Sequence, residues 1–295
     1  MAIQSLSIVV PGKRCINNCK FCVSRTHEDI IYEDKISEIV EGKWPKRVSD
    51  SRDLKYFKAL RYARDLGCTT LMLTGECEPQ QNKRFLHFFL SRMPKYLFNN
   101  IEIQTTGRGL EKEDILSLAR LGINTFSISV SSFDDEENNK IIGNKDPRSQ
   151  INLKNLCRNI KDAGCLLRLS LNLNDSFYHF LDTSGILRVC KQVYDADQVT
   201  LRKLYKSGKD CEQDKWIANH CDACKDDDYF QYIRMNGTPL EILPYGMTKY
   251  SLEGVGTVAD GDCMAKKNID EIRYLILRPD CHLYTRWDDP ASIIF

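Results

Sequence analysis

The sequence repeats one local pattern, in which a helical stretch ends in Gly and a run of β-branched and apolar residues follows at once. It occurs around Gly67 (DLG-CTTLML), Gly122 (RLG-INTFSIS) and Gly164 (DAG-CLLRLSL). Glycine readily takes the left-handed conformation that ends a helix before a strand. The stretch before Gly164 also has the period of an amphipathic helix. Its apolar residues at i, i+3, i+4 and i+7 are Leu153, Leu156, Cys157 and Ile160.

Six strands are predicted, at residues 5–10, 69–74, 101–106, 125–130, 166–173 and 198–204, with helices between them. Strands that alternate with helices pair in parallel through right-handed crossovers. The expected fold is therefore α/β, a partial (β/α)6 barrel. In such folds the chemistry lies at the C-terminal ends of the strands. The polar segment 43–53 is predicted to be a loop on the first crossover.

The pattern changes after residue 206, where a Cys- and Asp-rich stretch precedes short strand-like pieces such as PLEIL and RYLIL. We therefore expect a barrel domain at 1–206 and a small, irregular α+β extension at 207–295 that covers the barrel mouth.

The charges nearly cancel, with 42 Lys+Arg against 41 Asp+Glu and a formal charge of +1. This balance disfavours a large nucleic acid or an anionic membrane as a partner. The sequence has no apolar run near the length of a membrane span, and its start, MAIQSLSIVV, lacks the features of a signal peptide. A cytoplasmic protein is expected.

Thirteen cysteines, an odd number in a long chain without a signal peptide, indicate core residues, metal ligands or redox groups rather than disulfides. Cys15, Cys19 and Cys22 follow the first predicted strand directly. Thiolates are the preferred protein ligands of iron–sulfur clusters, and three of them leave the fourth iron of a cubane open. The alternatives are a zinc site or a chance spacing.

The run CINNCKFC resembles the C-x3-C-x2-C signature of the radical S-adenosylmethionine (SAM) superfamily, with a likeness extending over about residues 5–205. The resemblance implies a 4Fe-4S cluster on Cys15, Cys19 and Cys22, with SAM bound at its open iron. It also implies reductive cleavage of SAM to a 5′-deoxyadenosyl radical, fed by an electron donor such as flavodoxin or ferredoxin. An aromatic residue at the position of Phe21 helps to seat the adenine in that family.

The end of the second strand, LMLTGECEPQ, resembles the Gly-Gly-Glu-Pro loop that binds the SAM methionyl group in this family. Either Gly75-Glu76 is the Gly-Glu pair, or Cys77 replaces the second glycine and Glu78 keeps the register. The third strand ends in Gln-Thr-Thr-Gly, similar to Thr-Asn-Gly, with Thr106 in place of Asn.

The fourth and fifth strands supply further cofactor candidates. By the same resemblance Ser129 faces the SAM ribose and Ser131 replaces a common Asp. Alternation along RLSLNLN places Arg168 and Asn172 on one polar face. Arg168 is a candidate partner for the SAM carboxylate, and Asn172 for the ribose or methionyl group. The alternative is an edge strand that faces solvent.

The C-terminal third holds more cysteines. Cys221, Cys224, Cys263 and Cys281 could bind a second iron–sulfur cluster, and His220 with three of them could bind zinc. Free thiols are the third alternative.

The tail is similar to a SPASM or twitch domain but degenerate, because Cys281 stands where a turn glycine belongs. Its hairpin is a hypothetical substrate contact through one or more of four residues: Arg286, Trp287, Asp288 and Asp289.

Three functions remain open from the sequence. The first is hydrogen abstraction from a small molecule or nucleotide, because SSFDDEENNKIIG is similar to the matching strand of nucleotide-dehydrating members of the superfamily. The second is modification of a peptide or protein, which the SPASM-like tail suggests. The third is a non-catalytic metal-binding protein on the same barrel. Candidate acid–base residues at the mouth are Lys203, Tyr205 and Glu102.

Overall fold

The structure is a computed structural model. It describes residues 3–12, 14–26, 51–94, 96–242, 248–260, 272, 274–287 and 289–295, with the backbone alone at 51–54 and 260. The loop predicted over 43–53 lies outside the described residues as far as residue 50, and a helix already begins at Ser51. No described helix is long and apolar enough to cross a membrane.

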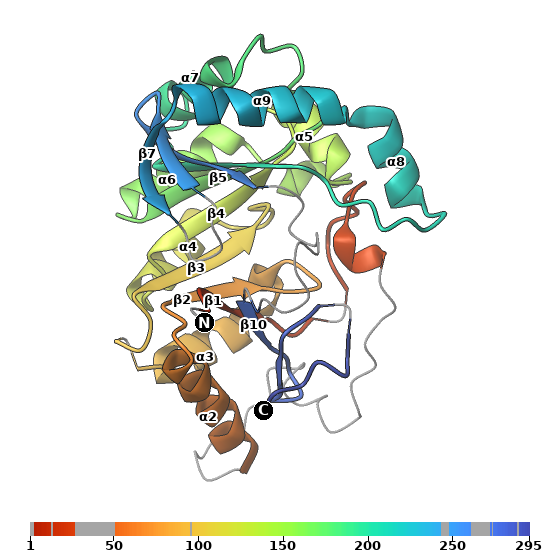
Figure 1. Cartoon of the computed structure of the whole chain (residues 1–295). Helices are drawn as coiled ribbons and strands as arrows, with labels where there is room; N and C mark the ends of the chain where they lie inside the picture. The colour runs from red at the N-terminus through yellow and green to blue at the C-terminus, as the bar shows by residue number, and fades with distance from the viewer. Residues whose placement is uncertain are drawn as a thin grey trace.

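The six predicted strands are confirmed, and each begins within one residue of its expected start. Their bounds are β1 Ser5–Val9, β2 Thr70–Thr74, β3 Asn100–Thr105, β4 Thr125–Val130, β5 Leu166–Asn172 and β6 Gln198–Arg202. Neighbouring strands in this series pair in parallel and in chain order. The series forms the curved centre of a sheet that does not close, so the partial barrel is also confirmed (Figure 1).

Helices cover the outside of this sheet. They are α2 Ser51–Asp65, α3 Lys83–Arg92, α4 Lys112–Arg120, α5 Asp135–Ile141, α6 Leu153–Asp162 and α7 Thr183–Gln192, with short 3-10 turns at Val23–Arg25 (η1), Pro79–Asn82 (η3) and Pro147–Ser149 (η4). All four apolar residues of the predicted α6 stripe are buried. The glycines after α2, α4 and α6 have φ of 106°, 110° and 75°, as the repeated pattern predicts.

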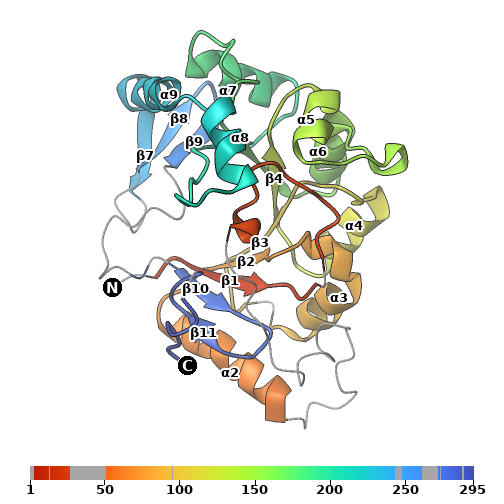
Figure 2. The ribbon, with the colours of Figure 1, turned by 90° about the vertical axis from the view of Figure 1, so that its right-hand side faces the viewer.

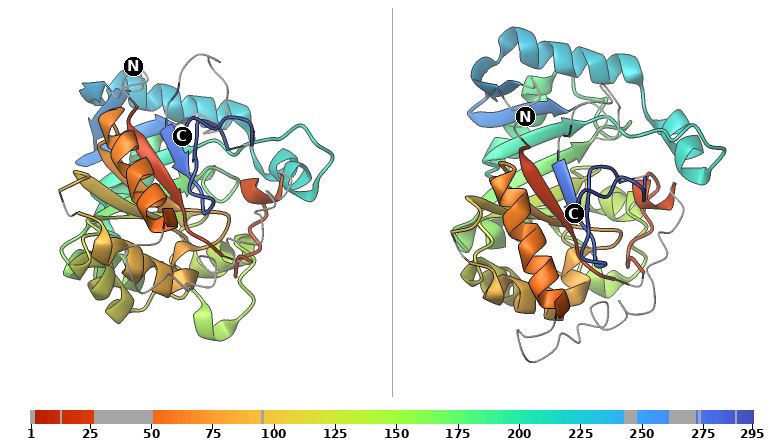
Figure 3. Two further views of the ribbon diagram at one scale, coloured as in Figure 1. Left: turned by 90° about the horizontal axis from the view of Figure 1, so that it is seen from below. Right: turned by 60° about the horizontal axis from the view of Figure 1, so that its bottom comes forward.

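The C-terminal third extends the same sheet at both edges. Helices α8 Glu212–His220 and α9 Ala223–Asn236 lead to β7 Thr238–Ile242, β8 Thr248–Leu252 and β9 Val255–Asp260, and then to the hairpin β10 Tyr274–Leu277 and β11 Leu283–Tyr284. β9 pairs in parallel with β6, and β10 pairs in parallel with β1. Figure 3 shows α2 lying beside β1 and β10. The division at residue 206 stays a prediction.

The expectation of an irregular segment after residue 206 was wrong for α8 and α9. The Asp-rich composition conceals a helix whose inner face carries Tyr229, Phe230 and Ile233, all buried. The Asp222 side chain accepts from the first backbone amides of α9, which begins the helix. The three buried apolar residues do recur with the period of a helix, but the polar and charged residues of α9 are more numerous than they are.

A buried acid on α9 gives a pH-dependent prediction. Asp226 is 3% exposed, and burial raises the pKa of its carboxyl to about 6. Because the folded pKa exceeds the unfolded value, the stability contribution is complete below about pH 4 and is lost as the pH rises through 6. Asp226→Asn should therefore stabilise the protein at pH 7.5 by roughly 1–3 kcal/mol, and this gain should be about 1 kcal/mol smaller at pH 5. Urea unfolding of both proteins at the two pH values measures it, and a gain that is independent of pH would contradict the assignment.

Candidate active site

A cavity of 260 Å³ lies at the carboxyl ends of the barrel strands. It is lined from β1 through β6, as a parallel α/β fold requires of its site. Eleven of the thirteen residues predicted for the cluster and cofactor line it: Cys15, Cys19, Phe21, Cys22, Gly75, Glu76, Cys77, Glu78, Thr106, Ser129 and Asn172. The two that do not are Ser131 and Arg168.

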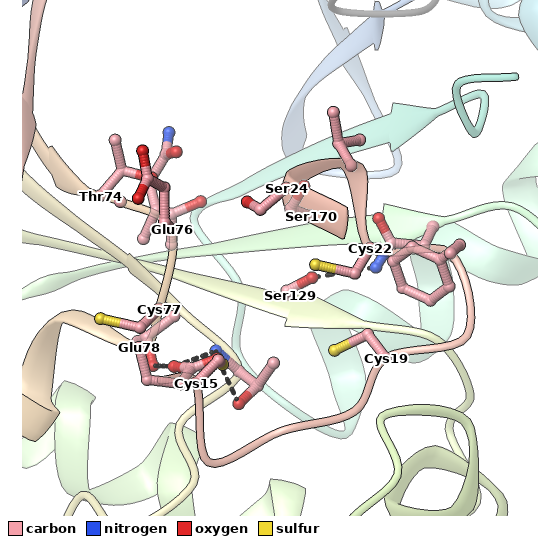
Figure 4. Close-up of a pocket in the computed structure, with 18 of the residues that line it drawn as sticks. Cys15, Cys19, Cys22, Ser24, Thr74, Glu76, Cys77, Glu78, Ser129 and Ser170 are labelled. Atoms are coloured by element: carbon pink, nitrogen blue, oxygen red, sulfur yellow. Dashed lines mark hydrogen bonds between the residues drawn. The ribbon is translucent and has the colours of Figure 1, made fainter. Parts of the chain in front are cut away.

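The loop after β1 carries the three predicted cluster cysteines. Figure 4 shows the sulfur atoms of Cys19 and Cys22 directed from this loop toward the middle of the cavity. Burial raises the pKa of the Cys15 and Cys19 thiols, and the nearby Cys22 and Glu78 charges raise that of Cys19 further. This crowding of negative charge is what a strongly cationic iron–sulfur core would relieve.

The donor set fits a cluster better than a single metal ion. Within the described ranges, no three Cys, His, Asp or Glu side chains gather closely enough to meet at one ion. In a cubane each thiolate binds a different iron, so its three ligands lie further apart than those of a zinc site. Three thiols from one short loop around one cavity are consistent with that arrangement.

Backbone hydrogen bonds hold this loop against the end of α5. The Asn18 amide donates to the Ile142 carbonyl at 2.9 Å, and the Lys20 amide donates to the Ile141 carbonyl at 3.1 Å. Gly143 follows at φ 69°, and a Cβ there would lie 2.6 Å from the Asn18 backbone oxygen. The geometry of the cysteine loop thus depends on a glycine more than 120 residues later in the chain.

Glu78 ties three loops together at the cavity wall. It is 7% exposed, and its carboxylate accepts from the Asn17 side-chain amide at 2.8 Å and from the Thr106 backbone amide at 3.1 Å. The Thr105 hydroxyl and the Gln80 amide donate to the same carboxylate. Because protein donors surround its oxygens, Glu78 acts on the cavity by positioning the loops after β1 and β3.

Replacing Glu78 with Gln should test this positioning role. Gln puts an NH2 group where one carboxylate oxygen accepts, so buried donors lose their partner. We expect a loss of roughly 2–4 kcal/mol in the free energy of unfolding and at most half of the wild-type iron after reconstitution. The control Glu137→Gln breaks only an exposed pair with Lys140 and should change the stability by less than about 0.5 kcal/mol. Equal stability of the two variants would contradict the role given to Glu78.

The polar side chains of β4 and β5 meet across neighbouring strands. The Asn172 side-chain amide donates to the Ser129 hydroxyl at 2.9 Å and to the Ser131 hydroxyl at 3.3 Å. Ser129 and Asn172 line the cavity, whereas Ser131 is buried behind Asn172. This pair at the ends of two adjacent strands leaves hydrogen-bonding atoms beside the cavity. The alternative of a solvent-facing β5 is wrong, because β5 lies between β4 and β6.

Arg168 is not brought to the cavity. Its guanidinium pairs with Glu102 at 2.5 Å and donates to the Gln198 side-chain oxygen at 2.8 Å and 3.0 Å. Arg168 is the third residue of β5, whereas Asn172 is its last, so Arg168 lies nearer the amino end of the strand. Glu102 is fully buried and needs a cation. Arg168 therefore lies away from the cavity where SAM was predicted to bind, with its guanidinium occupied by Glu102 and Gln198.

One residue that the sequence reasoning missed is Arg202, the last residue of β6, which lines the cavity together with Lys203 and Tyr205. A signal for it was available, because Gln198, Thr200 and Arg202 alternate along β6 as Arg168, Ser170 and Asn172 do along β5.

Helix α8 lies over the cysteine loop, as Figure 2 shows. The Trp216 ring contacts the Phe21 ring with centroids 5.8 Å apart, and Trp216 stacks on His220 at 4.5 Å. Lys209 donates to the Thr26 carbonyl at 2.9 Å. Phe21, predicted to seat the adenine, is thus contacted by an element from the C-terminal third.

The hairpin β10–β11 is tied to the loop after β2. Arg278, 1% exposed, pairs with Glu76 at 3.4 Å and donates to the Trp287 carbonyl at 2.7 Å. The Trp287 ring lies 5.7 Å from the same guanidinium. Arg286 pairs with Asp289 at 3.7 Å, and Asp288 lies outside the described residues. A substrate contact by these four residues stays a prediction.

The cysteines of the C-terminal third occupy separate environments. Cys221 donates to the Leu173 carbonyl at 3.4 Å, Cys224 is exposed, and Cys281 is buried in the hairpin turn with φ 67°. That positive φ explains why a glycine is usual at this turn position. The Nδ1 of His220 lies 2.7 Å from an Asp175 oxygen. Cys263 lies outside the described residues, and a second cluster or zinc site stays a prediction.

Comparisons with known proteins bear on the family and the fold of the chain. Residues 9–183, more than half of the chain, match the family model of the Radical SAM superfamily. No protein in the curated set matches the sequence. Two crystal structures of SuiB from Streptococcus suis are similar, each with a TM-score of 0.58. One is bound to the precursor peptide SuiA, at 13% identity, and the other to SAM, at 12%.

The alignment with SuiB covers 97% of this chain and 60% of SuiB, so this chain spans less than two-thirds of that protein's length. At such low identity the likeness shows the fold alone. The family model and the cysteine loop together carry the assignment. The chain belongs to the radical SAM superfamily.

Proposed function

We propose that this protein holds a 4Fe-4S cluster on Cys15, Cys19 and Cys22 and uses it to cleave SAM reductively, with hydrogen abstraction from a polar small molecule. When bound, the cluster supplies the electron that cleaves SAM to a 5′-deoxyadenosyl radical. The observation that carries the proposal is that three thiols and eight further predicted cofactor residues line one cavity. They come from five consecutive regions of the chain.

In that scheme, the residues of this chain bind the cluster and SAM and orient them. The Cys loop is fixed by backbone hydrogen bonds to α5 and by Asn17 to Glu78. The glycine of the loop after β2, Gly75, lets the backbone approach a methionyl group closely. Ser129 and Asn172 offer hydroxyl and amide groups to a ribose.

The polar side chains of the cavity wall favour a polar substrate. Side chains that face inward from β3 to β5 include Gln104, Ser127 and Ser170, all of which line the cavity. The interior of a parallel barrel is more often filled by branched apolar residues. Polar groups placed there need hydrogen-bond partners, and a polar ligand supplies them. A nucleotide or another hydrophilic metabolite fits this wall better than an apolar one.

The test is SAM cleavage by anaerobically reconstituted protein reduced with dithionite. We expect about four irons per chain and formation of 5′-deoxyadenosine. A fully loaded cluster without any cleavage would overturn the proposal and favour a non-catalytic metal-binding protein. Flavodoxin or ferredoxin should replace dithionite as the electron donor.

A peptide substrate is the second candidate. One of the SuiB structures holds a precursor peptide, and that protein shares this fold. Adding either the low-molecular-weight filtrate of a cell extract or its peptide fraction to the reduced protein separates the candidates. Faster SAM cleavage with the filtrate supports a small molecule, whereas faster cleavage with only the peptide fraction supports a peptide.

A further inference from the structure

Arg202 presents an unused cation to the cavity. It ends β6 at the carboxyl edge of the barrel and lines the cavity. Its Nε is buried, and no described group accepts a hydrogen bond from it. A guanidinium has five N–H donors in a fixed planar fork, and burying one of them without an acceptor costs free energy.

Three other cations of the barrel and its hairpin, one of which also lines the cavity, have acidic partners. Arg168 pairs with Glu102 at 2.5 Å, Lys203 with Asp227 at 2.5 Å, and Arg278 with Glu76 at 3.4 Å. Arg202 has no ion pair with any acid among the described residues. Asp260 stands opposite Arg202 in the β6–β9 register, and the structure describes only the backbone of Asp260. Among the described side chains, Arg202 therefore has no acid that neutralises it, and a ligand in the cavity can do so.

The position of Arg202 separates it from the proposed site of the SAM carboxylate. That carboxylate belongs at the cluster, beside the loops after β1 and β2, and four strand steps separate β2 from β6. The neighbour of Arg202 on β5 is Asn172, a proposed ribose contact. Arg202 therefore lines the cavity at the opposite end of the strand series from the loops after β1 and β2.

We propose that Arg202 binds an oxyanion of the substrate, a carboxylate or a phosphate, through its planar fork. Bidentate pairing of guanidinium with either group is the strongest recognition that an arginine offers. That the bound anion belongs to a substrate rests on the proposed function. The anion site itself depends only on the geometry around Arg202. The substrate class is then an anionic polar small molecule.

Calorimetric titration of the reconstituted protein, saturated with SAM, tests the site with two probes, pyrophosphate and succinate. Wild-type protein should bind at least one of them. Arg202→Met should weaken that binding at least tenfold, and Arg202→Lys should weaken it by a smaller factor because it keeps the charge without the fork. The control Arg188→Met removes an exposed arginine from α7 and should bind as wild type. SAM affinity should be the same in all four proteins.

Several results would overturn the inference. They are no binding of either probe by wild type, unchanged binding in Arg202→Met, or an equal loss in Arg188→Met. A tenfold loss of SAM affinity in Arg202→Met with unchanged probe binding would instead assign Arg202 to the SAM carboxylate. If Arg202→Met does not fold, undiminished probe binding in Arg202→Lys counts against the planar fork. A failure of the proposed function would show in a different measurement, in which reduced wild-type protein forms no 5′-deoxyadenosine.

Discussion

Cys19→Ala should abolish cluster binding and SAM cleavage while the barrel stays folded. Cys19 is the second of the three predicted ligands in sequence, between Cys15 and Cys22. Like them, it lines the cavity. Two thiolates cannot hold a site-differentiated cubane in this loop, so we expect less than about one iron per chain after reconstitution. Formation of 5′-deoxyadenosine should fall at least a thousandfold. Iron quantitation and product analysis by chromatography measure the two effects.

The matched control for this variant is Cys68→Ala. Cys68 is fully buried in the hydrophobic core and does not line the cavity. Removing its sulfur should cost about 1 kcal/mol of stability and leave the iron content unchanged. If Cys19→Ala retained iron and cleavage at the level of Cys68→Ala, the cluster assignment would be wrong.

Gly143→Ala should damage the cluster site from outside the cysteine loop. A Cβ at this position would lie 2.6 Å from the Asn18 backbone oxygen and 2.7 Å from the Asn18 Cβ. Both contacts are closer than real Cβ atoms approach, so the loop or the end of α5 must shift. Two backbone hydrogen bonds join these segments, from Asn18 to Ile142 and from Lys20 to Ile141. The shift should break them, with a reduction of at least tenfold in the rate of SAM cleavage and a clear loss of iron.

Gly164→Ala separates this clash from the strain of a left-handed residue. Gly164 has φ 75°, close to the 69° of Gly143, but no heavy atom lies within 4 Å of a Cβ placed there. Both variants should lose about 1–2 kcal/mol from the backbone conformation itself. Only Gly143→Ala should lose iron. If both variants kept full iron and full cleavage, the packing of the loop on α5 would not matter for the site.

The strand order and the location of the cavity followed from local sequence patterns. The helix, glycine and strand pattern around Gly67, Gly122 and Gly164 depends on the backbone preferences of neighbouring residues, which do not change when the chain folds. The cysteine loop was predicted for the same reason, because its three ligands lie within eight residues. Parallel pairing then placed the ends of successive strands at one edge, where most of the predicted residues do line the cavity.

The roles of the charged residues required the tertiary structure. Arg168 and Arg202 belong to similar alternating polar patterns on β5 and β6. Arg168 is neutralised by Glu102, 66 residues away in sequence, whereas Arg202 lines the cavity. Such pairings join side chains on different strands, so they depend on which strands become neighbours and in which register. The same holds for Glu78, whose donors come from the loops after β1 and β3.

The sequence by itself therefore determined the family, the cysteine loop and the positions of the strands, since each depends on residues close together in the chain. Only the tertiary structure decided that β9 and β10 extend the barrel sheet, that Gly143 supports the cysteine loop, and which arginine faces the cavity. The physical reason is that burial and electrostatic pairing depend on distances between residues far apart in sequence, and folding sets those distances.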